Sequence, residues 1–194
     1  METPETGKAH VKTERDVRIH AELWHTSDCL LRAGKERAKG SAHQFRASLA
    51  FRAFALEAFL NWIGLQLVPH WKYLERLKPQ EKLDLLTDIL KVKPDYGSRP
   101  WQVVRDLFHF RNTIAHGKPE SKETETCVEL EHLLNGDTVF IQAKWESFCT
   151  ETSAVRAQED VLELANILYN QANLTHEGPR GPFSFGFQTR RAGF

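Results

Sequence analysis

The chain has 194 residues, of which 41% are hydrophobic and 27% are charged. These values are ordinary for a soluble globular protein, and the length is sufficient for one domain with a hydrophobic core. Lysine plus arginine and aspartate plus glutamate both number 26, so the formal net charge is zero. Coating of nucleic acid by bulk charge depends on many phosphate contacts, so this balance counts against it, but it leaves room for a small basic site.

The cysteines and apolar runs count against further classes of protein. Three cysteines lie far apart and form no Cys-x-x-Cys pair, so the sequence predicts neither a disulfide framework nor a zinc site. The N-terminal stretch METPETGKAHVKTERD has no apolar signal core, and no apolar run approaches the ~20 residues of a membrane span. We therefore expect a cytoplasmic protein without a membrane partner.

The first half of the chain predicts a flexible tail at 1–12, followed by two helices that open a helical domain at 13–175. The first helix is expected from Thr13 to about Lys39, and the second from Ser41 to Pro69. The sequence Ser-Ala-His-Gln at the start of the second matches a capping box. This second helix is apolar nearly all round, which is typical of a central, buried helix. The apolar stripe of the first helix contains Val17, Ala21, Trp24 and Leu31.

The second half predicts three more helices, at 79–92, 101–116 and about 153–174. Between the last two, Asn135-Gly136 and the sequence TVFI are compatible with one short β-hairpin. The Gly-, Phe- and Arg-rich tail at 176–194 is interpreted as an exposed tail, with docking on another surface or stacking on bases as the alternative. The expected fold is all-α, an antiparallel bundle of four or five helices.

One face of the helix that ends at residue 116 carries a polar stripe. Arg105, His109, Asn112 and His116 follow the spacing i, i+4, i+7, i+11, which places them within a narrow wedge of an ideal helix. The stripe alone favours a solvent-facing surface over a functional site.

Arg111 lies outside that stripe, on an otherwise apolar face, and therefore needs an anion. Glu57, which shares a face with Asn61 on the expected central helix, is a carboxylate among apolar residues and needs a cation. We predict that Arg111 and Glu57 meet. The contact either satisfies a buried ion pair and nothing more, or it holds the guanidinium toward a cleft.

His116 lies in the last turn of its helix, just before Gly117. The free carbonyl groups there favour a positive charge, so an imidazolium at this place could donate a proton near neutral pH. The alternative is a capping histidine without a further role. His109 is interpreted as a neighbour of the site, and the spacing of the remaining histidines suggests no metal cluster.

The stretch FRNTIAHGKP resembles the Arg-x4–6-His signature of the HEPN superfamily, with Arg111 and His116 as the pair and Asn112 as the polar residue after the arginine. The order of helices agrees over residues 41–117 and loosely over 150–175. The resemblance implies an all-α fold that commonly forms a two-fold dimer, in which paired Arg and His residues cleave RNA. Many such proteins act in toxin–antitoxin or anti-phage systems, whereas others bind nucleotides or serve as interaction modules.

A dimer would also solve a geometric problem. Arg111 and His116 are five residues apart and hence ~140° apart around an ideal helix, so one motif does not easily present both to one phosphate. In a two-fold pair, the arginine of one chain can approach the histidine of the other.

The resulting hypothesis is a metal-independent endoribonuclease without a cofactor, in which the 2′-hydroxyl of RNA attacks the adjacent phosphate. His116 is expected as general acid or base, Arg111 as the group that stabilises phosphoryl charge, and Asn112 as an orienting amide. Supporting roles are expected for Glu57, Asn61, His109 and Arg105, and substrate contacts for Arg105 and Lys118.

The expected partners are RNA, a second copy of the chain, and an antitoxin or defence-system protein. The main alternative is a non-catalytic nucleotide-binding or interaction module. A hydrolase with a cysteine or serine nucleophile has little support, because the sequence has no nucleophile elbow.

Overall fold

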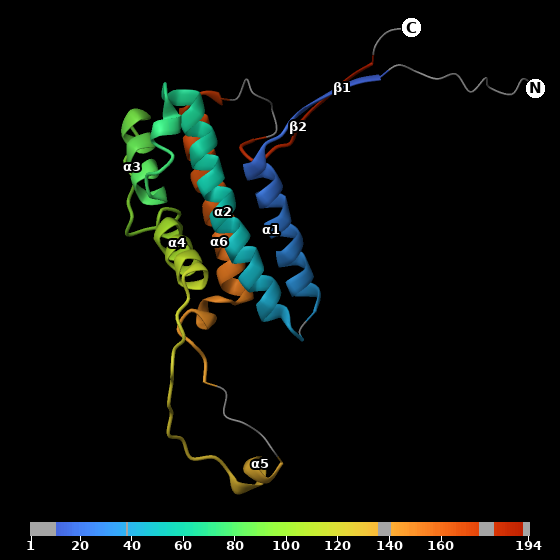
Figure 1. The fold of residues 1–194 in the computed structure, drawn as a ribbon, viewed down its shortest axis with the longest axis vertical. Coiled ribbons are helices and arrows are strands. Elements are labelled where there is room, and N and C mark those ends of the chain that lie inside the picture. Colours follow the sequence, from blue (N-terminus) through green and yellow to red (C-terminus); the bar gives the residue numbers. More distant parts are fainter. Residues whose placement is uncertain (1–10, 38, 136–140, 175–180, 192–194) are drawn as a thin grey trace, which may run out of the picture.

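The computed structural model describes residues 11–37, 39–135, 141–174 and 181–191, and these form a helical bundle (Figure 1). Its longest helices are α1, α2 and α6, and the shorter α3 and α4 lie on one side of α2. The helices in chain order are α1 (Ile19–Glu36), α2 (Ser41–Leu67), the 3-10 turn η1 (Trp71–Tyr73), α3 (Pro79–Ile89), α4 (Gln102–Ala115), α5 (Leu130–Leu134), the 3-10 turn η2 (Glu146–Phe148) and α6 (Glu151–Gln171).

The central helix is α2, as its apolar sequence predicts. It contacts α1, α3, α4 and α6, and it buries side chains along its whole length. Close contact also extends past its end: a Cβ at Gly64 would lie only 2.2 Å from the buried indole of Trp71, so η1 can pack here only against glycine. The core residues that α2 buries most completely are Leu49, Ala53, Ala55, Leu56, Phe59, Leu60 and Ile63.

By length and composition α2 could also cross a membrane, since its most apolar window has a mean hydropathy of 1.2. The sequence-based expectation that no apolar run approaches a membrane span underestimated this helix. However, 56% of that window is buried inside the bundle, and a core helix of a helical domain has the same properties.

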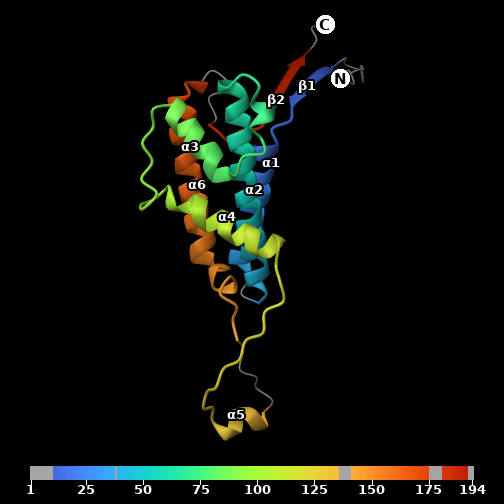
Figure 2. The same cartoon turned by 60° about the vertical axis from the view of Figure 1, so that its left-hand side comes forward.

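The all-α bundle is confirmed, but not all neighbouring helices alternate in direction. In both views α1 runs opposite to α2, whereas α6 runs in the same direction as α2 (Figures 1 and 2). This follows from the long connection between α4 and α6, which projects from the bundle and returns to the end where α2 begins. The connection carries α5 at its far end, and the described part of 120–150 contains no strand. Residues 136–140, with most of the expected hairpin strand, lie outside the described residues.

The start of the first helix was predicted wrongly. Residues expected to open it form strand β1 (Val11–Asp16), and α1 begins only at Ile19. β1 pairs antiparallel with β2 (Gly186–Arg191), and the register joins Val11 to Arg191 and Asp16 to Gly186. The expected flexible tail at 1–12 therefore overlaps β1 at its last two residues, and its first ten lie outside the described residues.

The C-terminal tail is not simply exposed, in contrast to the favoured interpretation. The Phe183 ring stacks on the Trp24 ring of α1 with centroids 4.1 Å apart and an interplanar angle of 8°. The carbonyl oxygen of Pro182 lies 3.1 Å from Nε2 of the buried His20. Aromatic stacking and this contact hold the tail against α1. The tail has no hydrophobic core of its own, so these contacts with the bundle give it an ordered position.

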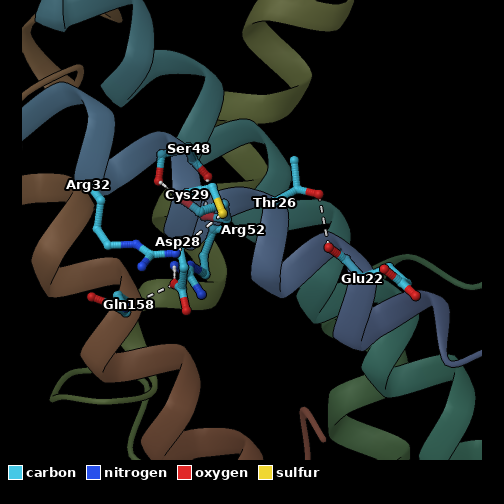
Figure 3. Close-up of polar contacts among 9 residues, drawn as sticks. Glu22, Thr26, Asp28, Cys29, Arg32, Ser48, Arg52 and Gln158 are labelled. Carbon is cyan, nitrogen blue, oxygen red and sulfur yellow. Dashed lines mark hydrogen bonds and ion pairs between the residues drawn. The ribbon is translucent and has the colours of Figure 1, made fainter. Parts of the chain in front are cut away.

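A polar cluster ties α1 to α2 and α6 (Figure 3). The Arg52 guanidinium of α2 is buried, donates to the Asp28 carboxylate of α1 at 2.5 Å, and lies 3.7 Å from the centre of the Trp24 ring. The Gln158 amide of α6 donates to the same Asp28 oxygen at 2.9 Å. A buried cation needs such a partner, so the cluster fixes how the three long helices sit against one another.

Candidate functional site

The helix α4 presents its faces as its sequence predicts. Val103, Leu107 and Phe110 are buried against the bundle, whereas Arg105 and His109 on the opposite face are exposed. The helix crosses α2 at an angle (Figure 2), and the side chains of its polar stripe are exposed.

The predicted contact between Arg111 and Glu57 is confirmed. The Arg111 Nη2 donates to Oε2 of Glu57 at 2.7 Å, a charge-assisted hydrogen bond that joins α4 to α2. The pair is not sealed in the core, because the two side chains keep 20% and 29% of their surface exposed. The pair is therefore partly exposed, which fits both a purely structural ion pair and a guanidinium held toward a cleft.

A second cation, which sequence reasoning missed, contacts the same carboxylate. Lys82 Nζ of α3 lies 3.5 Å from Oε1 of Glu57, and the Lys82 side chain is 1% exposed. One carboxylate thus faces two cations, and the three side chains together carry one net positive charge. A sequence signal existed: Lys82 precedes the buried Leu86 by four residues, which places it on the buried face of α3.

Apolar contacts and the Glu57 bond hold the Arg111 guanidinium on its inner side. Its central carbon lies 6.0 Å from the Phe54 ring centroid and 5.5 Å from that of Phe108. Its Nε is buried and donates no hydrogen bond to any described residue. An arginine has five N–H donors, and among the described residues the Nη2 bond to Glu57 is the one hydrogen bond that this side chain donates.

Arg111 and Glu57 line a surface pocket of about 480 Å³ between α4 and the turn that precedes α3. The same pocket is lined by Arg105, His109 and Asn112, so five of the predicted site residues are brought together. Arg76 and Lys78 line its opposite wall, and nothing in the sequence pattern had marked them as site residues.

The remaining predicted residues lie elsewhere. His116 caps the C-terminus of α4, where its backbone N–H donates to the Asn112 carbonyl at 3.0 Å, and its exposed side chain does not line this pocket. Lys118 lines a different pocket, together with Lys122 and Trp145. Asn61 does not line the Arg111 pocket either, and its amide oxygen is buried and accepts no hydrogen bond from the described residues.

The three cysteines form no disulfide in the described part of the chain, and they differ in exposure. Cys149 is buried, and burial raises the pKa of its thiol, which is opposite to the shift that activates a nucleophile. Cys29 and Cys127 are exposed. Over the described ranges, no three histidine, cysteine or acidic side chains gather as metal ligands.

Comparisons of the chain with models of known families, with curated proteins and with solved structures found no match. The function is therefore inferred from the geometry of the Arg111 pocket, the exposed His116 and the resemblance of the α4 motif.

Proposed function

We propose that this chain is a metal-independent endoribonuclease of HEPN type that acts as a homodimer. The observation that carries the proposal is the anchoring of Arg111: Glu57 holds the guanidinium at 2.7 Å on the wall of an open pocket. A cation fixed in this way at a solvent-accessible site suits the stabilisation of charge that grows on a phosphoryl group. The exposed His116, at the end of the same helix, supplies an imidazole that can accept or donate a proton.

The proposed reaction is an internal transfer of the phosphoryl group. The 2′-oxygen of a ribose forms a bond to the adjacent phosphorus and loses its proton to one His116 acting as base. The bond from phosphorus to the 5′-oxygen breaks, and that oxygen receives a proton from a second His116 acting as acid. The products are a 2′,3′-cyclic phosphate and a free 5′-hydroxyl, and Asn112 orients the phosphate beside Arg111.

The dimer is part of the proposal because one chain does not offer both groups in one pocket. His116 does not line the pocket of its own Arg111. A two-fold axis near the end of α4 would bring the His116 of one chain toward the Arg111 of the other and the two His116 residues toward each other.

The first test is RNA cleavage in the presence of EDTA. Arg111→Ala and His116→Ala are expected to lower the cleavage rate by about a hundredfold or more, since each removes charge stabilisation or proton transfer. The matched controls are Arg32→Ala and His43→Ala, which remove an exposed arginine and an exposed histidine elsewhere on the molecule. Cleavage that requires added metal, or that survives both site changes, rejects the proposed reaction.

A toxin or an anti-phage effector is the proposed biological role, with an antitoxin or defence protein as partner. Expression of the wild-type chain in bacteria should then arrest growth, and His116→Ala should relieve the arrest at an equal protein level. Growth arrest by both chains would show that toxicity has another source.

The second candidate is a non-catalytic module that binds a nucleotide at the same pocket. The absence of His116 from the pocket lining favours it. It predicts nucleotide binding that depends on Arg111 and is unchanged by His116→Ala, with no RNA cleavage under any condition.

A further inference from the structure

The wall of the Arg111 pocket opposite α4 carries two basic side chains from the turn before α3. Arg76 and Lys78 are exposed and line the pocket, and neither side chain forms an ion pair with any described residue. The turn itself is fixed, because the Lys78 backbone N–H donates to the Glu81 carboxylate at 2.7 Å and Leu77 N–H donates to the Leu74 carbonyl at 3.0 Å. The two cations are therefore presented from an ordered backbone.

The balance of charge in the pocket is positive, unlike that of the whole chain. Four cations line it, Arg76 and Lys78 on one wall and Arg105 and Arg111 on the other, against the two carboxylates Glu57 and Glu75. Lys82 contacts Glu57 from beneath at 3.5 Å, which further offsets that negative charge, and Arg105 is 3.4 Å from its neighbour Asp106. The whole chain has zero net charge, so this pocket is more positive than the average of the chain.

The remaining lining groups suit a nucleotide rather than a bare anion. The pocket volume of about 480 Å³ lies in the range of small-ligand sites. Asn112 and Gln80 offer amide donors and acceptors, and the exposed ring of His109 offers a flat surface for stacking. Guanidinium groups on both walls match the geometry of phosphate oxygens.

We propose that Arg76 and Lys78 bind a backbone phosphate of single-stranded RNA that flanks the phosphate held by Arg111. This assignment rests on the proposed function for the identity of the strand, and it adds a subsite that the α4 motif does not contain. The turn before α3 then sets the path of the strand across the pocket.

The test is binding of a strand that cannot be cleaved. A fluorescein-labelled 2′-O-methyl RNA of about six nucleotides, within the length that one single-strand site holds, is titrated and followed by fluorescence anisotropy. The double variant Arg76→Ala/Lys78→Ala is expected to bind about tenfold more weakly and to show a shallower dependence of binding on salt. The matched control, Arg32→Ala/Lys35→Ala, removes the same charge from exposed positions on α1, on the far side of the bundle, and should change affinity less than about twofold.

Equal losses of affinity in the two double variants would overturn the subsite, because the effect would then be one of overall charge. The single variant Arg76→Glu provides a second check, since charge reversal at the pocket should weaken binding further than Arg32→Glu. Thermal unfolding of each variant identifies any loss of fold.

Failure of the subsite and failure of the proposed function give different results. If wild-type protein does not cleave RNA but binds the methylated strand through Arg76 and Lys78, the subsite stands and the nuclease falls. If cleavage requires Arg111 and His116 while the Arg76→Ala/Lys78→Ala variant binds as the wild type does, the nuclease stands and the subsite falls.

Discussion

At Glu57, a single carboxylate meets a buried lysine and a partly exposed arginine. Lys82 is almost fully buried, so its charge depends on Glu57, whereas Arg111 retains contact with the pocket. The two cations therefore have different places in the site. Lys82 and Glu57 form its base, and Arg111 lies between that base and the solvent. Without the carboxylate, the lysine would be a buried charge with no described partner.

This arrangement predicts a strong coupling between Glu57 and Lys82. Glu57→Ala should lower the free energy of unfolding by about 3 kcal/mol, since it leaves the buried ammonium unpaired. The double variant Glu57→Ala/Lys82→Met should recover most of that loss, because it removes the stranded charge as well. Urea unfolding of the two single variants and the double variant measures the coupling, and losses that simply add would show that the two residues act independently.

Part of the site could be predicted from individual residues of the sequence. A carboxylate on an apolar helix and an arginine on an apolar face each need a partner, so the Arg111–Glu57 contact could be predicted. Arg76 and Lys78 could not, because their place opposite α4 is set by how the turn before α3 packs against the bundle. A loop cation has no periodicity that marks it as part of a site.

The secondary-structure elements also differ in how well the sequence predicts their bounds. Prolines and glycines mark the ends of α2, α3 and α4 in the sequence, and the predicted bounds lie close to those observed. The capping box expected from Ser41 was wrong, because the N-cap of α2 is Gly40 and makes no side-chain capping bond. The start of α1 was misjudged because β1 pairs with β2 across almost the whole length of the chain. Such pairing depends on a distant partner and leaves little local signal.

The docking of the C-terminal segment on α1 predicts a specific dependence on pH. Burial lowers the pKa of His20 from 6.5 to about 4, helped by the positive charge of Arg18 and opposed by the Pro182 hydrogen bond and by Asp16. Above pH 6.5, His20 is neutral in both the folded and the unfolded chain. As the pH falls toward about 4, His20 binds a proton in the unfolded chain but stays neutral in the folded chain. Stability is therefore lost as the pH falls through this window.

The measurement compares urea unfolding at about pH 7.5 and about pH 5, where His20 should contribute a loss of about 2 kcal/mol. The variant His20→Gln keeps an N–H donor but does not titrate. Between the two pH values, its free energy of unfolding should therefore fall by about 2 kcal/mol less than that of the wild type. His43→Gln, at an exposed histidine, should behave as the wild type does. Identical pH dependence in all three proteins would contradict the assignment.

The whole molecule combines a helical core with a pocket in which basic side chains outnumber acidic ones. The long helices α1, α2 and α6 are fixed to one another by the Asp28–Arg52–Gln158 cluster, on the side of the bundle away from α4 (Figures 1 and 3). The polar stripe of α4 and the basic pocket beside it remain accessible on the other side. A second copy that meets this chain along α4 would complete a site with groups that one copy holds apart.

Mixing of the wild-type chain with His116→Ala tests that central claim most directly. The variant is expected to be inactive in EDTA by itself. After an equal amount of the variant is added under conditions that exchange subunits, we expect the cleavage rate of the wild-type protein to fall to about half, because half of the wild-type subunits are then paired with a subunit that lacks the second His116. A rate that is unchanged although mixed dimers form, or a variant that cleaves RNA by itself, would contradict a site shared between two chains.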